Sequence, residues 1–267
     1  MSVLFHRDHF EGKHILVTGA TGGIGEAVVQ KLLASGANVT AAGRSDEKLS
    51  RLKQTAHYHS DASRLMAVSA DIGDSDGRKY LMEQAEDGFG PVYGLVNSAG
   101  ITGGDTVDQI QEDDLEKVMH LNFTAAVMLS QLVYQGMKDM QGGRIVNISS
   151  LSGLRGTYGS TAYAGSKFAL IGFTQSFALE AVEHNIRVNA VCPGFVDTEM
   201  AREILEKKAS RNGRSYEEER REAEKGLPSG RMTRPEEVAD AVLFLLSDAC
   251  GNMIGESMKI SGGSVMR

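Results

Sequence analysis

Three side chains near the middle of the chain have the types and spacing of a catalytic group: Ser150, Tyr163 and Lys167. Tyr163 and Lys167 lie four residues apart, so a helix there places them on one face, about one turn apart. A free phenol titrates near pH ~10. A cation beside it favours phenolate, so we expect Lys167 to lower the pKa of Tyr163. Ser150 follows a strand-like run and would supply a second hydroxyl to orient a carbonyl or alcohol oxygen.

A glycine-rich turn near the N-terminus follows an apolar strand at residues 14–18 and precedes a helical pattern. Gly19 and Gly23 can turn tightly and let a pyrophosphate approach the backbone, while Gly25 permits close helix packing. The helix N-terminus would offer unpaired N–H groups to the anion. No Gly-Lys-Ser/Thr follows, which excludes the phosphate loop of nucleotide hydrolases. The order of strand, turn and helix predicts a dinucleotide site.

These motifs together resemble the short-chain dehydrogenase/reductase family, from about Phe10 to the Gly262-Gly263 pair, and in particular its 3-oxoacyl-carrier-protein reductases and ketoreductases. The segment 97–100 matches the family's Asn-Asn-Ala-Gly element, except that Ser98 replaces the second Asn. The resemblance implies a catalytic set of Asn122, Ser150, Tyr163 and Lys167, with Asn122 holding a proton-relay water near the lysine. It also implies the cofactor-binding residues Gly19, Thr21, Gly23, Ile24, Gly25, Arg44, Asp71, Ile72, Asn97, Ala99, Gly100, Tyr163, Lys167, Pro193, Gly194, Val196 and Thr198.

Alternating strand and helix patterns predict an α/β fold with a parallel sheet covered on both faces. We expect strands at 14–18, 38–43, 65–70, 93–97, 144–149, 187–191 and 257–260, and helices at 23–34, 46–54, 75–87, 113–138, 162–184 and 235–246. The whole chain, 1–267, reads as one Rossmann domain. The resemblance implies a doubly wound seven-stranded sheet of order 3-2-1-4-5-6-7, a substrate lid at about 199–227, and a homotetramer in which helices 113–138 and 162–184 pair.

The cofactor preference is predicted from the end of the second strand. NAD-preferring members of the family carry an acidic residue where this chain has Gly43, and Arg44 comes next. A guanidinium group can bind a 2′-phosphate through charge-assisted hydrogen bonds, whereas a carboxylate repels it. We therefore expect NADP(H), with NAD(H) possible.

Composition and net charge indicate the compartment and the partners of the protein. The 267 residues are 41% hydrophobic, the net charge is −7, and only two cysteines occur. No disulfide framework, signal peptide or membrane span is predicted, so we expect a cytoplasmic protein without nucleic-acid or membrane partners. Cys192 is interpreted as a packing residue. His57 and His59 lack further ligands at suitable spacing, so no metal site is predicted.

The predicted reaction is reversible hydride transfer between NADPH and a ketone or secondary alcohol, with a 3-oxoacyl or similar ketone as substrate. An acidic carrier protein is a doubtful partner, because the positions that are basic in carrier-protein reductases correspond to Gln141 and His184, beside Glu180 and Glu183. Two alternatives remain open. One is an NAD-linked alcohol, hydroxy acid or sugar dehydrogenase, and the other is a non-catalytic NADP-binding protein.

Overall fold

All seven strands form one parallel sheet of order β3-β2-β1-β4-β5-β6-β7. The computed structural model describes residues 9–57, 61–103 and 105–266. The strands are β1 (His14–Thr18), β2 (Asn38–Gly43), β3 (Leu65–Ser69), β4 (Gly94–Asn97), β5 (Gly143–Ile148), β6 (Ile186–Pro193) and β7 (Ser257–Ile260). Every residue of β1 and β6 is buried, as expected for a sheet covered on both faces. The predicted Rossmann topology is confirmed.

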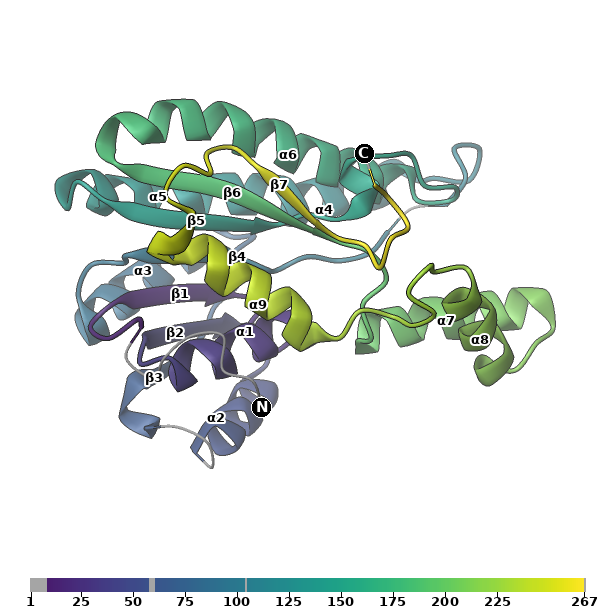
Figure 1. Ribbon diagram of the computed structural model, residues 1–267, viewed down its shortest axis with the longest axis horizontal. Coiled ribbons are helices and arrows are strands. Elements are labelled where there is room, and N and C mark those ends of the chain that lie inside the picture. The colour runs from purple at the N-terminus through teal and green to yellow at the C-terminus, as the bar shows by residue number, and fades with distance from the viewer. Residues whose placement is uncertain (1–8, 58–60, 104, 267) are drawn as a thin grey trace.

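Helices cover the two faces of the sheet in separate layers (Figure 1). They are α1 (Gly23–Ala34), α2 (Asp46–His57), α3 (Ser75–Phe89), α4 (Glu112–Met119), α5 (Ala125–Asp139), α6 (Thr161–Ala181), α7 (Glu199–Asn212), α8 (Tyr216–Lys225) and α9 (Pro235–Leu246). Buried side chains of α1 and α9 form one core with β1 and β2, and those of α3, α5 and α6 form the other. The sheet therefore stands between two apolar layers.

The predicted helix at 113–138 is interrupted. A short π-helix, His120–Thr124, separates α4 from α5 and carries the buried side chain of Asn122. Such bulges accommodate one extra residue per turn and often turn a side chain toward a functional site. The predicted continuous helix is wrong at this point, because a polar side chain is turned into the protein interior.

The pair α7–α8 projects from the body of the fold at the carboxyl end of the sheet (Figure 1). Residues 217–225 form most of α8, and this charge-rich helix is not entirely solvent-facing. The side chain of Glu219 is only 1% exposed. Packing between the two helices, rather than the local charge pattern, determines its burial.

Across the described part of the chain, no helix has the length and apolar character that spanning a membrane requires.

Candidate active site

The loops that follow the strands gather at one edge of the sheet. The parallel register places the ends of β1, β2 and β4 side by side, with Thr18 paired to both Ala42 and Asn97. Loops at the carboxyl ends of parallel strands form the ligand crevice of doubly wound folds. The glycine turn, Arg44 and the segment after β4 therefore line the same side of the molecule.

Two glycines of the turn, Gly19 and Gly23, have no space for a side chain. Gly19 has a φ of +60°, and a Cβ built on it would lie 2.7 Å from the Cα of Ala99. A Cβ on Gly23 would lie 2.6 Å from the Thr198 methyl group. The backbone at the start of α1 thus lies close to two other loops, and its N-cap residue, Gly22, has no side chain to bond the helix N–H groups.

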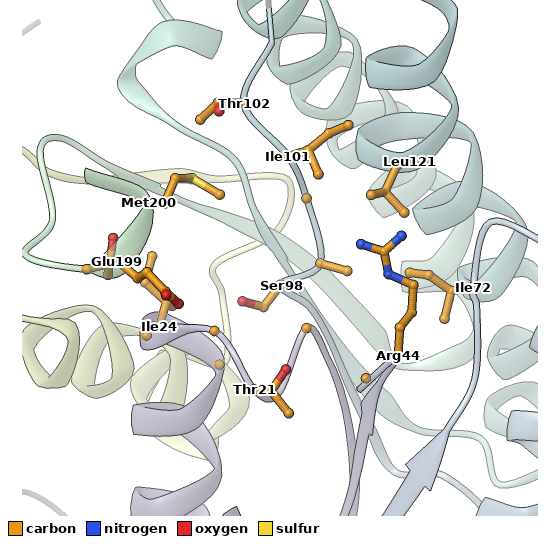
Figure 2. A pocket seen from close by; sticks show the side chains of 18 of the residues that line it. Thr21, Ile24, Arg44, Ile72, Ser98, Ile101, Thr102, Leu121, Glu199 and Met200 are labelled. Carbon is orange, nitrogen blue, oxygen red and sulfur yellow. The ribbon is translucent and has the colours of Figure 1, made fainter. Parts of the chain in front are cut away.

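A cavity of about 730 Å³ runs along this edge of the sheet. Its walls include eleven of the predicted cofactor residues, namely Gly19, Thr21, Gly23, Ile24, Gly25, Arg44, Asp71, Ile72, Ala99, Gly100 and Thr198. Figure 2 shows the Arg44 side chain reaching across the cavity toward Ile72 and Leu121. The remaining predicted cofactor residues, Asn97, Tyr163, Lys167, Pro193, Gly194 and Val196, do not line it.

The Asn97 side chain is hydrogen-bonded inside the protein. Its amide nitrogen donates to Ser130 Oγ at 3.0 Å and to Asn147 Oδ1 at 2.9 Å, and its side chain is buried. These bonds connect β4 with β5 and α5 behind the cavity wall. The structure thus gives the Asn97 side chain a scaffold role, and a cofactor contact of this residue stays a prediction.

Ser150, Tyr163 and Lys167 come together beyond the wall of this cavity. The Lys167 Nζ lies 5.7 Å from the centre of the Tyr163 ring and donates to the Ile148 carbonyl at 2.8 Å. Ser150 forms a hydrogen bond with the Tyr163 hydroxyl, and its own Oγ also accepts the Ser152 N–H at 3.1 Å. A Cβ on Gly100 would lie 3.6 Å from Lys167 Nζ, so the lysine lies next to the loop after β4 that lines the cavity.

The pKa of Tyr163 is shifted upward, not downward. Burial raises it because the phenolate loses solvation, and the hydrogen bond with Ser150 opposes this only in part. The prediction that Lys167 lowers this pKa is wrong for this structure. Burial also lowers the pKa of Lys167, from 10.5 to about 8, so the cation is itself poorly solvated. Tyr163 is therefore a protonated phenol at neutral pH and can act as an acid.

The Asn122 side chain anchors the loop after β4. Its Oδ1 accepts the Ile101 N–H at 2.8 Å, while its amide nitrogen donates to the Ile101 carbonyl at 2.9 Å and to Ser166 Oγ at 3.0 Å. Both ends of the amide are thus engaged within the protein. The Asn122 side chain therefore positions Ile101 and Ser166, and the proton-relay water that the resemblance implies at Asn122 stays a prediction.

Cys192 is fully buried and packs against Ile171 and Ala190, which agrees with the packing interpretation. Burial raises the pKa of its thiol to about 11, so the thiolate is disfavoured. Within the described ranges, no three His, Cys, Asp or Glu side chains are placed to hold a metal ion. His59 lies outside the described residues.

Helices α7 and α8 form a hairpin held by one buried carboxylate. Glu219 lies 2.8 Å from Lys208 Nζ and 3.4 Å from Arg214 Nη1, and Asn212 donates to it at 3.0 Å. These partners lower the pKa of Glu219 and keep it ionised. Arg220 joins α8 to Asp197 at the base of the hairpin at 2.7 Å. The two helices are therefore held together as one unit, with α8 tied to Asp197 at its base.

We predict that NADPH together with a bound ketone protects residues 199–227 from trypsin. Closure of this lid over its ligand would reduce the access of the protease to the exposed basic residues of α7 and α8. Limited proteolysis with and without both ligands measures this effect. Equal cleavage rates in the two conditions would contradict a ligand-dependent lid.

Several cavity residues were not found from the sequence. Lys48 comes from α2, Lys117 from α4, and Glu199, Met200 and Glu203 from α7. No local motif marks them, because each reaches the cavity only through the packing of its helix. Ser98, which departs from the family motif, also lines the wall.

Comparison with known proteins places these features in context. Residues 13–209 match the family model for short chain dehydrogenases. The 3-oxoacyl-acyl-carrier-protein reductase FabG of Thermotoga maritima is 36% identical over 256 residues, which cover 96% of this chain and 99% of that protein. The corresponding Vibrio cholerae protein is 33% identical over 258 residues, covering 97% of this chain and 99% of that protein.

Two solved structures resemble the fold closely. A variant of actinorhodin polyketide ketoreductase with NADPH superposes with a TM-score of 0.91 at 30% identity, covering 94% of this chain and 97% of that one. Levodione reductase also has a TM-score of 0.91, at 27% identity, covering 95% of this chain and 98% of that one.

Proposed function

Because the chain belongs to the short-chain dehydrogenase family, we propose that it is an NADPH-dependent reductase that interconverts a ketone and a secondary alcohol. The observation that carries this proposal is the meeting of three side chains: Ser150 interacts with the Tyr163 hydroxyl, and Lys167 Nζ lies 5.7 Å from the centre of the Tyr163 ring. The related reductases and the NADPH complex of a structural relative support the same reaction and cofactor.

The cavity fits a dinucleotide in shape and chemistry. Its volume of about 730 Å³ lies within the range of cofactor sites, and Gly22 leaves the N–H groups of α1 available to phosphate oxygens. Arg44 would pair with a 2′-phosphate, and Lys167 would donate to the hydroxyls of the nicotinamide ribose. The nicotinamide, when bound, supplies the hydride.

The protein side chains would then carry out the proton chemistry. Ser150 and Tyr163 would donate hydrogen bonds to the ketone oxygen and polarise the carbonyl group. Tyr163 would release its proton to that oxygen as the alcohol forms. The nearby Lys167 cation would stabilise the resulting phenolate, which burial alone disfavours.

A free ketone or a small thioester suits the surface better than an obligatory carrier-bound substrate. Near the ends of α5 and α6, Glu180 and Glu183 are exposed, and Gln141 provides no positive charge. An acidic carrier protein would meet like charge there, which slows its association. The proposed substrate is therefore a 3-oxoacyl compound or a similar ketone.

A panel of ketones with NADPH and NADH tests the proposed function. Absorbance of the reduced nicotinamide should fall with NADPH and at least one 3-oxoacyl thioester or simple ketone. Binding of NADP⁺ without turnover across the panel, in either direction, would instead favour the non-catalytic alternative.

We also propose that the chain assembles into a homotetramer through α4, α5 and α6. One face of α6 carries Gly165, Phe168, Gly172 and Leu179 at helical spacing; Phe168 is 47% and Leu179 is 71% exposed. A Cβ added at either glycine would meet no neighbouring atom within 4 Å. An exposed stripe of apolar and small residues suits close pairing with a second copy.

The predicted mass in solution is that of four chains. Light scattering coupled to size-exclusion chromatography measures it, and Leu179→Glu should shift the mass toward smaller species. A wild-type protein that remains a monomer at micromolar concentration would contradict the assembly.

A further inference from the structure

Lys48 follows Arg44 by four residues and lines the same cavity. It belongs to the first turn of α2, where its backbone N–H is bonded to Ser45 Oγ at 3.3 Å. Arg44 directly precedes this Ser45 cap, and both basic side chains line the cavity. The segment from the end of β2 to the first turn of α2 therefore contributes two cations to the cavity lining.

In this structure Lys48 has a partner on the opposite wall. Its Nζ lies 3.2 Å from Glu199 Oε2, at the first residue of α7, and Glu199 also lines the cavity. The two side chains are 50% and 75% exposed. Solvent screens such a pair, so it is weak and easily exchanged for a more highly charged partner.

The charges that line the cavity bear on how Lys48 would interact with a bound phosphate group. The lining contains four carboxylates, from Asp71, Asp114, Glu199 and Glu203, and three cations, from Arg44, Lys48 and Lys117. Lys117 comes from α4 and not from the turn that carries Arg44. Asp46 and Glu47, in the same turn as Lys48, are exposed and do not line the cavity. Arg44 and Lys48 are thus the two cations that the β2–α2 segment contributes to a lining with four carboxylates.

We propose that Lys48 is a second specificity-determining residue for the 2′-phosphate of NADP(H), and that it exchanges Glu199 for this phosphate when the cofactor binds. The inference rests on the proposed NADP(H) preference. A phosphate monoester carries about −1.5 to −2 charges at pH 7, more than the single charge of a carboxylate. Two cations match that charge better than Arg44 alone. Breaking the Lys48–Glu199 pair would also release the first turn of α7 from α2.

Binding of NADP⁺ and NAD⁺ to the purified protein, measured by calorimetry at one salt concentration, tests this proposal. Lys48→Gln should weaken NADP⁺ binding by about tenfold, or ~1.4 kcal/mol, and leave NAD⁺ binding within about twofold. Lys53→Gln is the matched control, because Lys53 is an exposed lysine on the same helix that does not line the cavity. Glu199→Gln should strengthen NADP⁺ binding, since the competing carboxylate is removed.

Lys48→Arg separates loss of charge from damage to the fold, because it should retain the preference for NADP⁺. If Lys48→Gln and Lys53→Gln bind NADP⁺ with equal affinity, the inference about Lys48 is overturned. The proposed function stays intact in that case, provided that the wild-type protein prefers NADP⁺. Equal weakening of both cofactors by Lys48→Gln would also overturn it. A wild-type preference for NAD⁺ would instead overturn the proposed cofactor itself.

Discussion

Replacing Tyr163 with Phe is expected to lower kcat for ketone reduction by about 10²- to 10⁴-fold, the usual contribution of a positioned acid. The substitution removes the hydroxyl that would donate the proton and leaves the aromatic ring in place. Cofactor affinity should remain nearly unchanged, because the substitution keeps the ring and leaves in place Arg44, Lys167 and the glycine turn, which are proposed to hold the cofactor. Steady-state rates and a separate NADPH titration measure the two effects.

Tyr158→Phe is the matched control for this substitution. Tyr158 lies five residues earlier in the chain and is 93% exposed, so the same chemical change should leave kcat unaltered. Lys167→Ala should reduce both turnover and cofactor binding, because Lys167 is proposed to hold the ribose as well as to stabilise the phenolate. Near-normal turnover of Tyr163→Phe on a good substrate would show that another group is the acid.

The pKa of Tyr163 also determines how the two directions of the reaction respond to pH. Burial raises this pKa, so the phenol stays protonated through neutral pH and is lost only as the pH rises through that raised value. Ketone reduction uses the phenol and should hold its rate at neutral pH. Alcohol oxidation uses the phenolate and should accelerate as the pH rises. Rates in both directions, measured with saturating substrates between pH 6 and about 10, test this contrast.

The second large effect is expected at the end of β2. Wild-type protein should prefer NADPH to NADH by roughly tenfold to a hundredfold, because a charge-assisted hydrogen bond contributes about 1.5–3 kcal/mol. Gly43→Asp combined with Arg44→Leu should reverse this preference, since it removes the attraction and adds a group that repels the 2′-phosphate. The ratio of kcat/KM values for the two cofactors, at one salt concentration, measures the change.

The structure provides the controls that this double substitution needs. A Cβ at position 43 would lie 3.2 Å from the Thr21 methyl group, so part of any loss could come from crowding. Gly43→Ala measures that crowding alone, and Arg44→Leu measures the loss of charge alone. A wild-type preference for NADH would contradict the role of Arg44 and favour an NAD-linked alcohol, hydroxy acid or sugar dehydrogenase.

Local patterns and family resemblance predicted most of the fold from the sequence. The stop of α1 near Gly36, with its φ of +86°, and the start of α9 at Pro235 depend on backbone preferences of single residues. The relation of Tyr163 to Lys167 depends only on the period of a helix. The strand order came from the resemblance and is confirmed. Such features are readable because their causes lie within a few residues or in a recurring motif.

Tertiary structure decided the properties that depend on distant neighbours. The direction of the Tyr163 pKa shift follows from burial, which spacing to Lys167 does not reveal. The Asn97 and Asn122 side chains are engaged by residues 21–50 positions away, so their motifs did not reveal these partners. Lys48 and Glu199 are separated by 151 positions and meet only across the cavity. Solvation and electrostatic interactions depend on distance in space, and the packing of helices on the sheet sets that distance.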